Sequence, residues 1–161
     1  MTTTITLDEI CTTLGTLQQR IQANMPEKSP TNSADTITLA TLPALGAKWQ
    51  GGRFAGVITQ KNGTHCAVVL LPGQSKRLTW SSAMAWAAKQ GGQIPTKSVI
   101  ALLFANVKAH ISPSGWYWTS ETNADDASYA WGCFFCNGDQ NFEDKSYEGC
   151  AVAVRCIPLT H

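Results

Sequence analysis

The stretch that decides the fold is 115–158, GWYWTSETNADDASYAWGCFFCNGDQNFEDKSYEGCAVAVRCIP. It contains three of the six tryptophans and four of the six cysteines. Three short apolar runs, at 116–120, 129–136 and 150–157, alternate with clusters of Asn, Asp, Ser and Gly. This pattern is typical of an antiparallel meander with polar connections. Because a rigid scaffold often presents binding residues on its loops, we place the function in this stretch.

The composition indicates one globular domain with few charges. Of its 161 residues, 43% are hydrophobic and only 14% are charged, below the quarter that is usual. A net charge of +1 gives no basis for nucleic-acid binding. Residues 1–115 carry ten Lys and Arg against four Asp and Glu, whereas 116–161 carry two against seven. We interpret this acidic excess as a solvated rim of loops.

Neither a membrane segment nor an export signal is expected. The sequence has no run of 18 apolar residues, so membrane insertion is not predicted. The N-terminus MTTTITLDE lacks the basic residues and the apolar core of a signal peptide, which predicts a product made in the cytoplasm. The six cysteines should then be reduced thiols that pack as small hydrophobes.

Residues 1–26 are predicted to form an appended N-terminal helix. Thr6 and Glu9 have the spacing of a capping box. The apolar positions that follow at spacings of three and four are Leu7, Ile10, Leu14, Leu17 and Ile21. This seam predicts a homo-oligomer, although a helix docked on its own domain would show nearly the same pattern. A polar linker at 27–35 separates the helix from a domain at 36–161.

The domain at 36–161 is predicted to be α+β, because strands, two helices and further strands follow one another without alternating. Strands are expected at 36–42, 54–59 and 65–71, with Pro72-Gly73 turning the chain. Thr79 is expected to cap the first helix, and the second is expected to start at Thr96 behind Pro95. The residues predicted to line the buried helix faces are Trp80, Ala83, Met84 and Ala87, then Val99, Ile100, Leu103, Phe104 and Val107.

No arrangement of nucleophile, base and acid is recognisable, so the chain is not expected to be an enzyme. His65, His110 and His161 are scattered along the sequence. Cys133 and Cys136 have metal-ligand spacing, but residues three apart on a strand point to opposite faces. No metal or cofactor is therefore predicted. A disulfide joining Cys133 to Cys150, or Cys136 to Cys156, would require an oxidising compartment.

The carboxylates of the acidic stretch have two interpretations. Glu121, Asp125 and Asp126 would ligate a hard cation if they met Asp139, Glu143 or Asp144. The interpretation as turn-forming residues is preferred, because Asp and Asn are common in turns.

The residues that we expect to bind a ligand lie between the apolar runs, where tyrosine and asparagine provide adaptable contacts. They are Glu121, Asn123, Tyr129, Asn137, Asp139, Gln140, Asn141, Phe142 and Tyr147. Trp116, Trp118 and Trp131 are interpreted as core residues.

Six short motifs occur in an order that resembles one family. They are W-S-S-A at 80–83, I-P-T at 94–96, Y-W-T-S at 117–120, A-W at 130–131, F-C-N-G at 135–138 and V-R-C-I at 154–157. Over residues 46–158 the chain is similar to the Lcl C-terminal domain family. The resemblance implies a C-type-lectin-like fold, in which two helices flank antiparallel sheets and the C-terminal strands and loops bind the ligand.

The family context also implies a function. Such domains occur in prophage genes, in bacterial adhesins and in targets of diversity-generating retroelements. The resemblance therefore implies a prophage-encoded, tail-associated or adhesin-like module, carried on a virion, that binds a protein or glycan surface. The alternatives are a phage assembly protein that uses the fold as a scaffold, and an enzyme. The chain lacks the Glu-Pro-Asn and Trp-Asn-Asp motifs of calcium-dependent lectins, which argues against calcium-dependent sugar binding.

Overall fold

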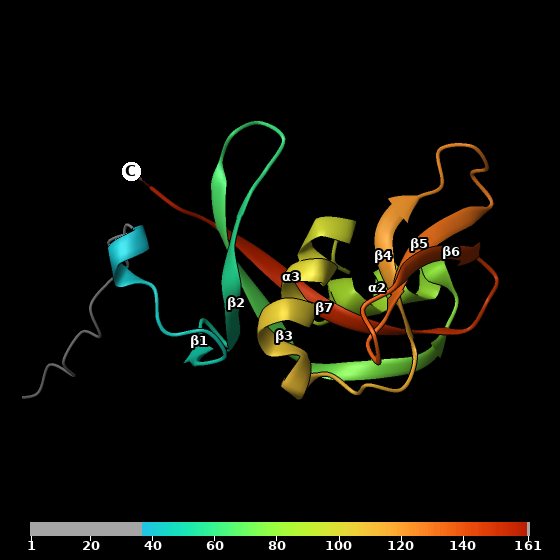
Figure 1. Ribbon diagram of the computed structural model, residues 1–161, viewed down its shortest axis with the longest axis horizontal. Helices are drawn as coiled ribbons and strands as arrows, with labels where there is room; N and C mark the ends of the chain where they lie inside the picture. The colour runs from blue at the N-terminus through green and yellow to red at the C-terminus, as the bar shows by residue number, and fades with distance from the viewer. Residues whose placement is uncertain (1–36, 161) are drawn as a thin grey trace, which may run out of the picture. The chain divides into compact units, whose positions relative to one another are not determined.

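The computed structural model describes residues 37–160, whose seven strands form one mixed sheet in the order β1-β2-β3-β7-β4-β5-β6 (Figure 1). The strands are β1 (Lys48–Trp49), β2 (Gly52–Thr59), β3 (His65–Leu78), β4 (Trp116–Thr122), β5 (Tyr129–Phe134), β6 (Gln140–Asp144) and β7 (Gly149–Pro158). The helices are η1 (Leu39–Thr41), α2 (Trp80–Lys89), α3 (Lys97–Val107) and η2 (Lys108–His110). This order of elements confirms the α+β class. The predicted N-terminal helix, its oligomerisation seam and the linker lie outside the described residues.

The two central strands, β3 and β7, are buried on both faces. Successive residues alternate between two cores: Val68 and Val152 pack with α3, whereas Val69 and Ala151 pack with α2. All four are fully buried. A strand covered on both faces needs apolar residues at consecutive positions, which explains the continuous runs CAVVLL and CAVAV. Figure 1 shows α2 and α3 on opposite sides of the sheet.

The two α-helices begin where the sequence predicts. The Thr79 hydroxyl accepts a hydrogen bond from the Ser82 amide, and the Thr96 hydroxyl accepts one from the Val99 amide. The buried residues of α3 include four of the five predicted ones, and Phe104 is partly buried. One prediction for α2 is wrong, because Met84 is 40% exposed.

Pro72 and Gly73 do not turn the chain, contrary to the prediction. They lie within β3, which continues to Leu78 and pairs with β7 on either side of them. The register shifts between Leu70 and Gln74, so the dipeptide forms a bulge. Proline is tolerated at a bulge because no ladder hydrogen bond needs its missing N–H.

The strand predicted at 36–42 is also not found in the described part of that segment, which contains the 3-10 turn η1. The Thr41 hydroxyl donates to the Thr38 carbonyl and accepts from the Thr38 amide. Threonine side chains compete with the sheet in this way by bonding the nearby backbone. The flanking residues Ile37 and Leu42 still pack against the core beside Phe54.

The sheet is not purely antiparallel, as the predicted meander would be. β4 pairs with β7 in parallel, with Tyr117 opposite Cys150, whereas every other ladder is antiparallel among residues 37–160. The parallel contact is short, because only this one pair of residues is in register. It joins the β4-β5-β6 meander to the buried central strands.

Within residues 37–160, neither α-helix has the length and hydropathy that a membrane-spanning helix needs.

Candidate functional site

The β5–β6 hairpin forms one edge of the sheet and includes a strand that the sequence analysis did not predict. Residues 140–144 form a strand, although the sequence analysis treated them as part of a connection. The strand lacks an apolar face, since four of its five residues are exposed. Its pairing with β5, in which Trp131 lies opposite Phe142, specifies its register. Consequently Gln140, Asn141 and Phe142 are strand residues and not loop residues.

One face of the hairpin carries three aromatic side chains next to the start of α3. The ring centroid of Phe142 lies 5.8 Å from that of Tyr129 and 5.5 Å from that of Trp131, both in edge-to-face contact. Phe142 is 41% exposed, and the other two are half-buried. We call this group, together with Lys97 and Glu121, the α3 face.

Lys97 organises the α3 face. Its ammonium nitrogen lies 3.2 Å from the ring centroid of Trp131, a cation–π contact. Its backbone amide donates to the Glu121 carboxylate at 3.4 Å, and its carbonyl accepts from the Gln140 side-chain amide at 3.0 Å. A carboxylate at a helix N-terminus is favourable because it accepts from an N–H group that has no partner within the helix. These bonds attach β4 and β6 to α3.

Trp131 is not a core residue, contrary to the prediction. Trp116 and Trp118 are buried as predicted, with 4% and 0% exposure. Trp131 is half-buried. Its ring contacts the Lys97 ammonium group and the ring of Phe142, which lies on the edge strand β6. The A-W motif alone could not distinguish these two environments.

The opposite face of the same hairpin surrounds a small cavity of about 90 Å³. We call it the Trp116 face. Its lining residues are Trp116, Phe134, Asn141, Glu143 and Tyr147, and Phe142 of the α3 face also borders the cavity. The rings of Trp116 and Phe134 are in contact, with centroids 4.9 Å apart. Phe134 and Tyr147 are 43% and 49% exposed. A Cβ at Gly132 would collide with the Trp116 indole, so a larger residue there would displace this ring.

Trp116 contributes an unsatisfied polar group to this face. Its indole Nε1 is buried and has no hydrogen-bond acceptor among the described residues. Trp118, by contrast, donates its Nε1–H to the Leu78 carbonyl at 2.9 Å. Buried donors are nearly always paired in proteins, so the unpaired Trp116 N–H is an exception among the described residues.

Three of the predicted binding residues stabilise turns. Asn123 accepts from the Asp125 amide at 3.0 Å, and Asn137 bonds both the backbone and the carboxylate of Asp139. Asn side chains commonly close turns in this way. The structure therefore divides the predicted set among the α3 face, the Trp116 face and two turns, and does not bring it together at one point.

The acidic side chains of this region also bond their own turns. The Asp126 carboxylate accepts from the Ser128 hydroxyl, and the Asp144 carboxylate accepts from the Ser146 hydroxyl. These bonds lower the pKa of both carboxyls. No group of three or more His, Cys, Asp and Glu residues in 37–160 is placed to hold a metal ion.

The cysteines are free thiols among the described residues. Tyr117 lies opposite both Cys133 on β5 and Cys150 on β7, so one strand separates the two cysteines. Strands two positions apart are about 10 Å apart, beyond the roughly 7 Å limit for a disulfide. This spacing excludes the Cys133–Cys150 disulfide that the sequence analysis considered for an oxidising compartment. Burial raises the pKa of Cys133 to about 11, with a smaller effect from Asp139.

The sequence analysis did not identify Lys97, Trp131 and Phe134 as surface residues of this region, and it named Glu143 only among the carboxylates of the acidic stretch. One signal was available for Lys97, because it directly follows the Thr96 cap and must therefore lie at the exposed start of a helix. Phe134 and Glu143 depend on the hairpin register, which their local sequence does not specify.

No protein-family model matches the chain, and no curated protein matches it. The resemblance drawn from the ordered motifs stays a prediction.

Proposed function

We propose that the chain is a recognition module that binds a protein or glycan surface through the β5–β6 hairpin and the residues around it. The observation that carries the proposal is the clustering of exposed aromatic side chains. The exposed large aromatics of residues 37–160 are Phe134, Phe142 and Tyr147, and all three belong to this hairpin or the turn after it. Aromatic residues are enriched at binding interfaces, where they supply large contact areas with few rotatable bonds.

The polar groups around these rings support recognition through hydrogen bonds. Every Asp and Glu of residues 37–160 lies between 121 and 148. On the α3 face, Lys97 contacts both the Glu121 carboxylate and the Trp131 ring, so hydrogen-bonding groups and an apolar surface lie close together.

The shape of the region favours a surface ligand over a small molecule. The cavity on the Trp116 face is about 90 Å³, well below the roughly 300 Å³ of the smallest typical small-molecule pockets. Exposed side chains on a hairpin at the sheet edge can instead contact an extended partner, because both faces of the hairpin are accessible there. A polysaccharide or a protein surface meets that requirement.

The finer proposal is a C-type-lectin-like fold in a prophage-encoded protein. It rests on the ordered motifs, and the α+β architecture with helices on both sides of the sheet is compatible with it. Within this proposal the β4–β6 region corresponds to the C-terminal strands and loops on which the resembling family places its binding face.

The test is a screen of glycan and protein arrays with the full-length protein, followed by affinity measurements on two matched variants. Phe142→Ala and Met84→Ala each truncate a side chain that is about 40% exposed, but Met84 lies on α2. Removal of a central aromatic anchor costs about 2 kcal/mol or more, which corresponds to roughly 30-fold weaker binding. We expect that loss for Phe142→Ala, and unchanged affinity for Met84→Ala.

Two results would count against recognition. Equal losses for the two variants would show that the hairpin is not the binding surface. Absence of any array partner that binds the wild-type protein more tightly than the Phe142→Ala variant would favour the assembly-protein alternative.

A further inference from the structure

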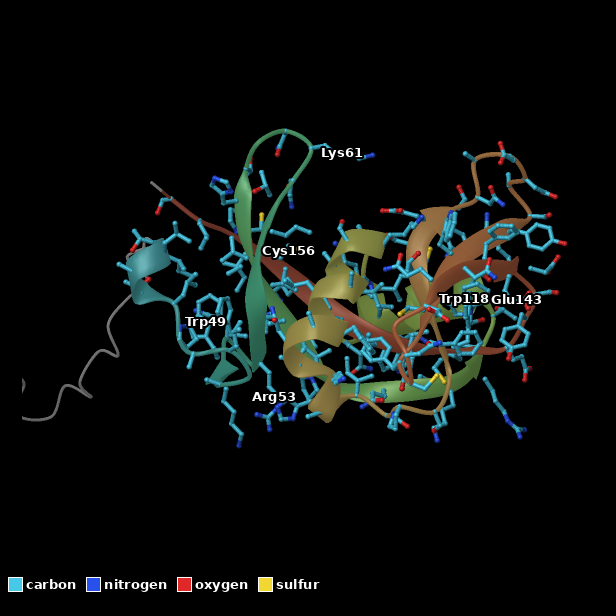
Figure 2. The ribbon with its side chains drawn as sticks, in the orientation of Figure 1. Trp49, Arg53, Lys61, Trp118, Glu143 and Cys156 are labelled. Carbon is cyan, nitrogen blue, oxygen red and sulfur yellow. The ribbon has the colours of Figure 1, made fainter. Side chains whose placement is uncertain are left out.

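A second cavity lies near the opposite end of the sheet from the hairpin, between the β1–β2 turn and the bulge of β3. Its volume is about 600 Å³, within the range of small-molecule sites. Apolar residues including Trp49, Leu70 and Pro72 line it together with the basic residues Lys48, Arg53 and His110. Figure 2 shows Trp49 and Arg53 well separated from Trp118 and Glu143.

The walls of the cavity are fixed by hydrogen bonds. The Gln74 side chain donates to the His110 carbonyl at 3.1 Å, and its oxygen accepts from the Ser112 amide at 2.9 Å and the Tyr117 hydroxyl at 2.8 Å. Gln74 thereby ties the end of the β3 bulge to the segment between η2 and β4. On the other side, an Arg53 N–H donates to the Gly46 carbonyl at 2.9 Å.

Two cations lie directly opposite each other beside this cavity. Lys48 on β1 and Arg53 on β2 are cross-strand partners, so their side chains project from the same face of the ladder. Like charges in this position destabilise a strand pair, because their Cβ atoms are only about 5 Å apart. An anion that lies between or beside the two charges would relieve this repulsion.

The surrounding sequence offers no carboxylate to compensate them. None of the lining residues is acidic, and the sequence contains no Asp or Glu between residues 37 and 120. The Arg53 guanidinium has five N–H donors, of which the bond to Gly46 occupies one. Among the described residues that line it, the cavity thus combines an apolar surface with positive charge and no carboxylate.

We propose that this cavity is a binding site for an organic anion with an apolar body, such as a carboxylate attached to a ring system. The anionic group lies against Lys48 and Arg53, and the apolar body contacts Leu70 and Pro72. The site is separate from the hairpin, so it is occupied independently of the surface recognition proposed above.

The first test uses 2-naphthoate as the probe and follows amide and indole signals of the isotope-labelled full-length protein by NMR. We expect saturable shifts at Gly51, Gly52 and Gly73 and at the Trp49 indole N–H, all of which belong to the lining. The matched neutral probe is 2-naphthamide. It should bind at least about tenfold more weakly, because hydrogen bonds to a charged group are worth more than neutral ones.

The second test separates binding from stability with two charge reversals. Lys48→Glu should weaken 2-naphthoate binding about tenfold or more, and should raise the urea midpoint because a carboxylate would then face Arg53. Lys61→Glu makes the same change at the tip of the β2–β3 hairpin, away from the cavity (Figure 2), and should leave the affinity unchanged.

Three results would overturn the proposal. They are equal affinities for the two probes, normal binding by Lys48→Glu, and equal losses for the two charge reversals. The last result would show a general effect of net charge and no local site.

Discussion

Two antiparallel strand pairs of the same sheet, β3–β7 and β5–β6, have opposite environments. In β3–β7, helices cover both faces, and residues 66–71 and 150–154 are all buried. In β5–β6, four of the five β6 residues are exposed, and exposed aromatics lie on both sides of the hairpin. The comparison indicates that the centre of the sheet provides stability, whereas its edge is free to contact a partner.

The largest expected effect is the loss of Trp118, which connects the two regions. Its ring is fully buried, and its Nε1–H donates to Leu78 at 2.9 Å. Trp118→Ala should lower the free energy of unfolding by about 3–5 kcal/mol, through both the cavity and the unpaired Leu78 carbonyl. Urea unfolding followed by circular dichroism measures this loss. A loss below about 1 kcal/mol would contradict the assignment of Trp118 to the core.

A smaller effect on stability is expected for Trp131→Ala on the α3 face. Its ring is half-buried and packs against Lys97 and Phe142. Truncation should cost about 1–2 kcal/mol, less than for a fully buried tryptophan, and the protein should remain folded. The same urea experiment checks this. If Trp131→Ala costs as much as Trp118→Ala, the edge is as important to stability as the centre, and the comparison fails.

The contrast between these tryptophans shows how much of the fold was predictable. The sequence correctly predicted the α+β class, the approximate starts of both α-helices and most strands, because helix starts and apolar runs are local signals. It did not predict β6, whose residues QNFED have no apolar alternation and depend on pairing with β5. The sequence also did not show that Trp131 is half-buried whereas Trp118 is fully buried, because the exposure of each side chain depends on the elements that pack against it.

The candidate site was less predictable than the fold. Its approximate region follows from the acidic, turn-rich composition of 121–148. The division into two faces depends on the register of Trp131 opposite Phe142, and the involvement of Lys97 depends on where α3 docks. Both are tertiary features that the local sequence does not encode.

An intermediate effect on the free energy of unfolding is expected at alkaline pH. It comes from two buried groups in the core beside the hairpin, Tyr117 and Cys133. Burial raises the pKa of Tyr117 to about 12 and that of Cys133 to about 11, above their values of 10.0 and 9.0 in an unfolded chain. Both groups keep their protons to a higher pH in the folded protein than in the unfolded chain. Their contribution to the free energy of unfolding is therefore fully present below about pH 9 and is lost as the pH rises toward 12.

Urea midpoints at about pH 8 and about pH 10.5 measure this decline. Cys133→Ala removes one of the two groups and should reduce the decline relative to its own value at neutral pH. A midpoint that rises with pH, or a decline that the variant does not alter, would show that these groups do not cause it.

The smallest expected effect concerns the turn after β6. The Ser146 hydroxyl and amide donate to Asp144 and lower the pKa of its carboxyl. Ser146→Ala should raise that pKa toward its ordinary value and change stability little, because the turn is exposed. Because a lowered carboxyl pKa stabilises the fold only above the unfolded value, the small change should vanish in acid. An NMR titration of Asp144 gives the result, and an unchanged pKa would contradict the role of the hydroxyl.

The most direct test of the central claim is amide hydrogen exchange of the full-length protein, with and without the partner identified on the arrays. The amides of 66–71 and 150–154 should exchange slowly in both states, since both faces of β3 and β7 are covered. The amides of 140–144 should exchange faster in the free protein and become protected when the partner binds. Protection that appears elsewhere while 140–144 stay unchanged would contradict the placement of recognition on the β5–β6 hairpin.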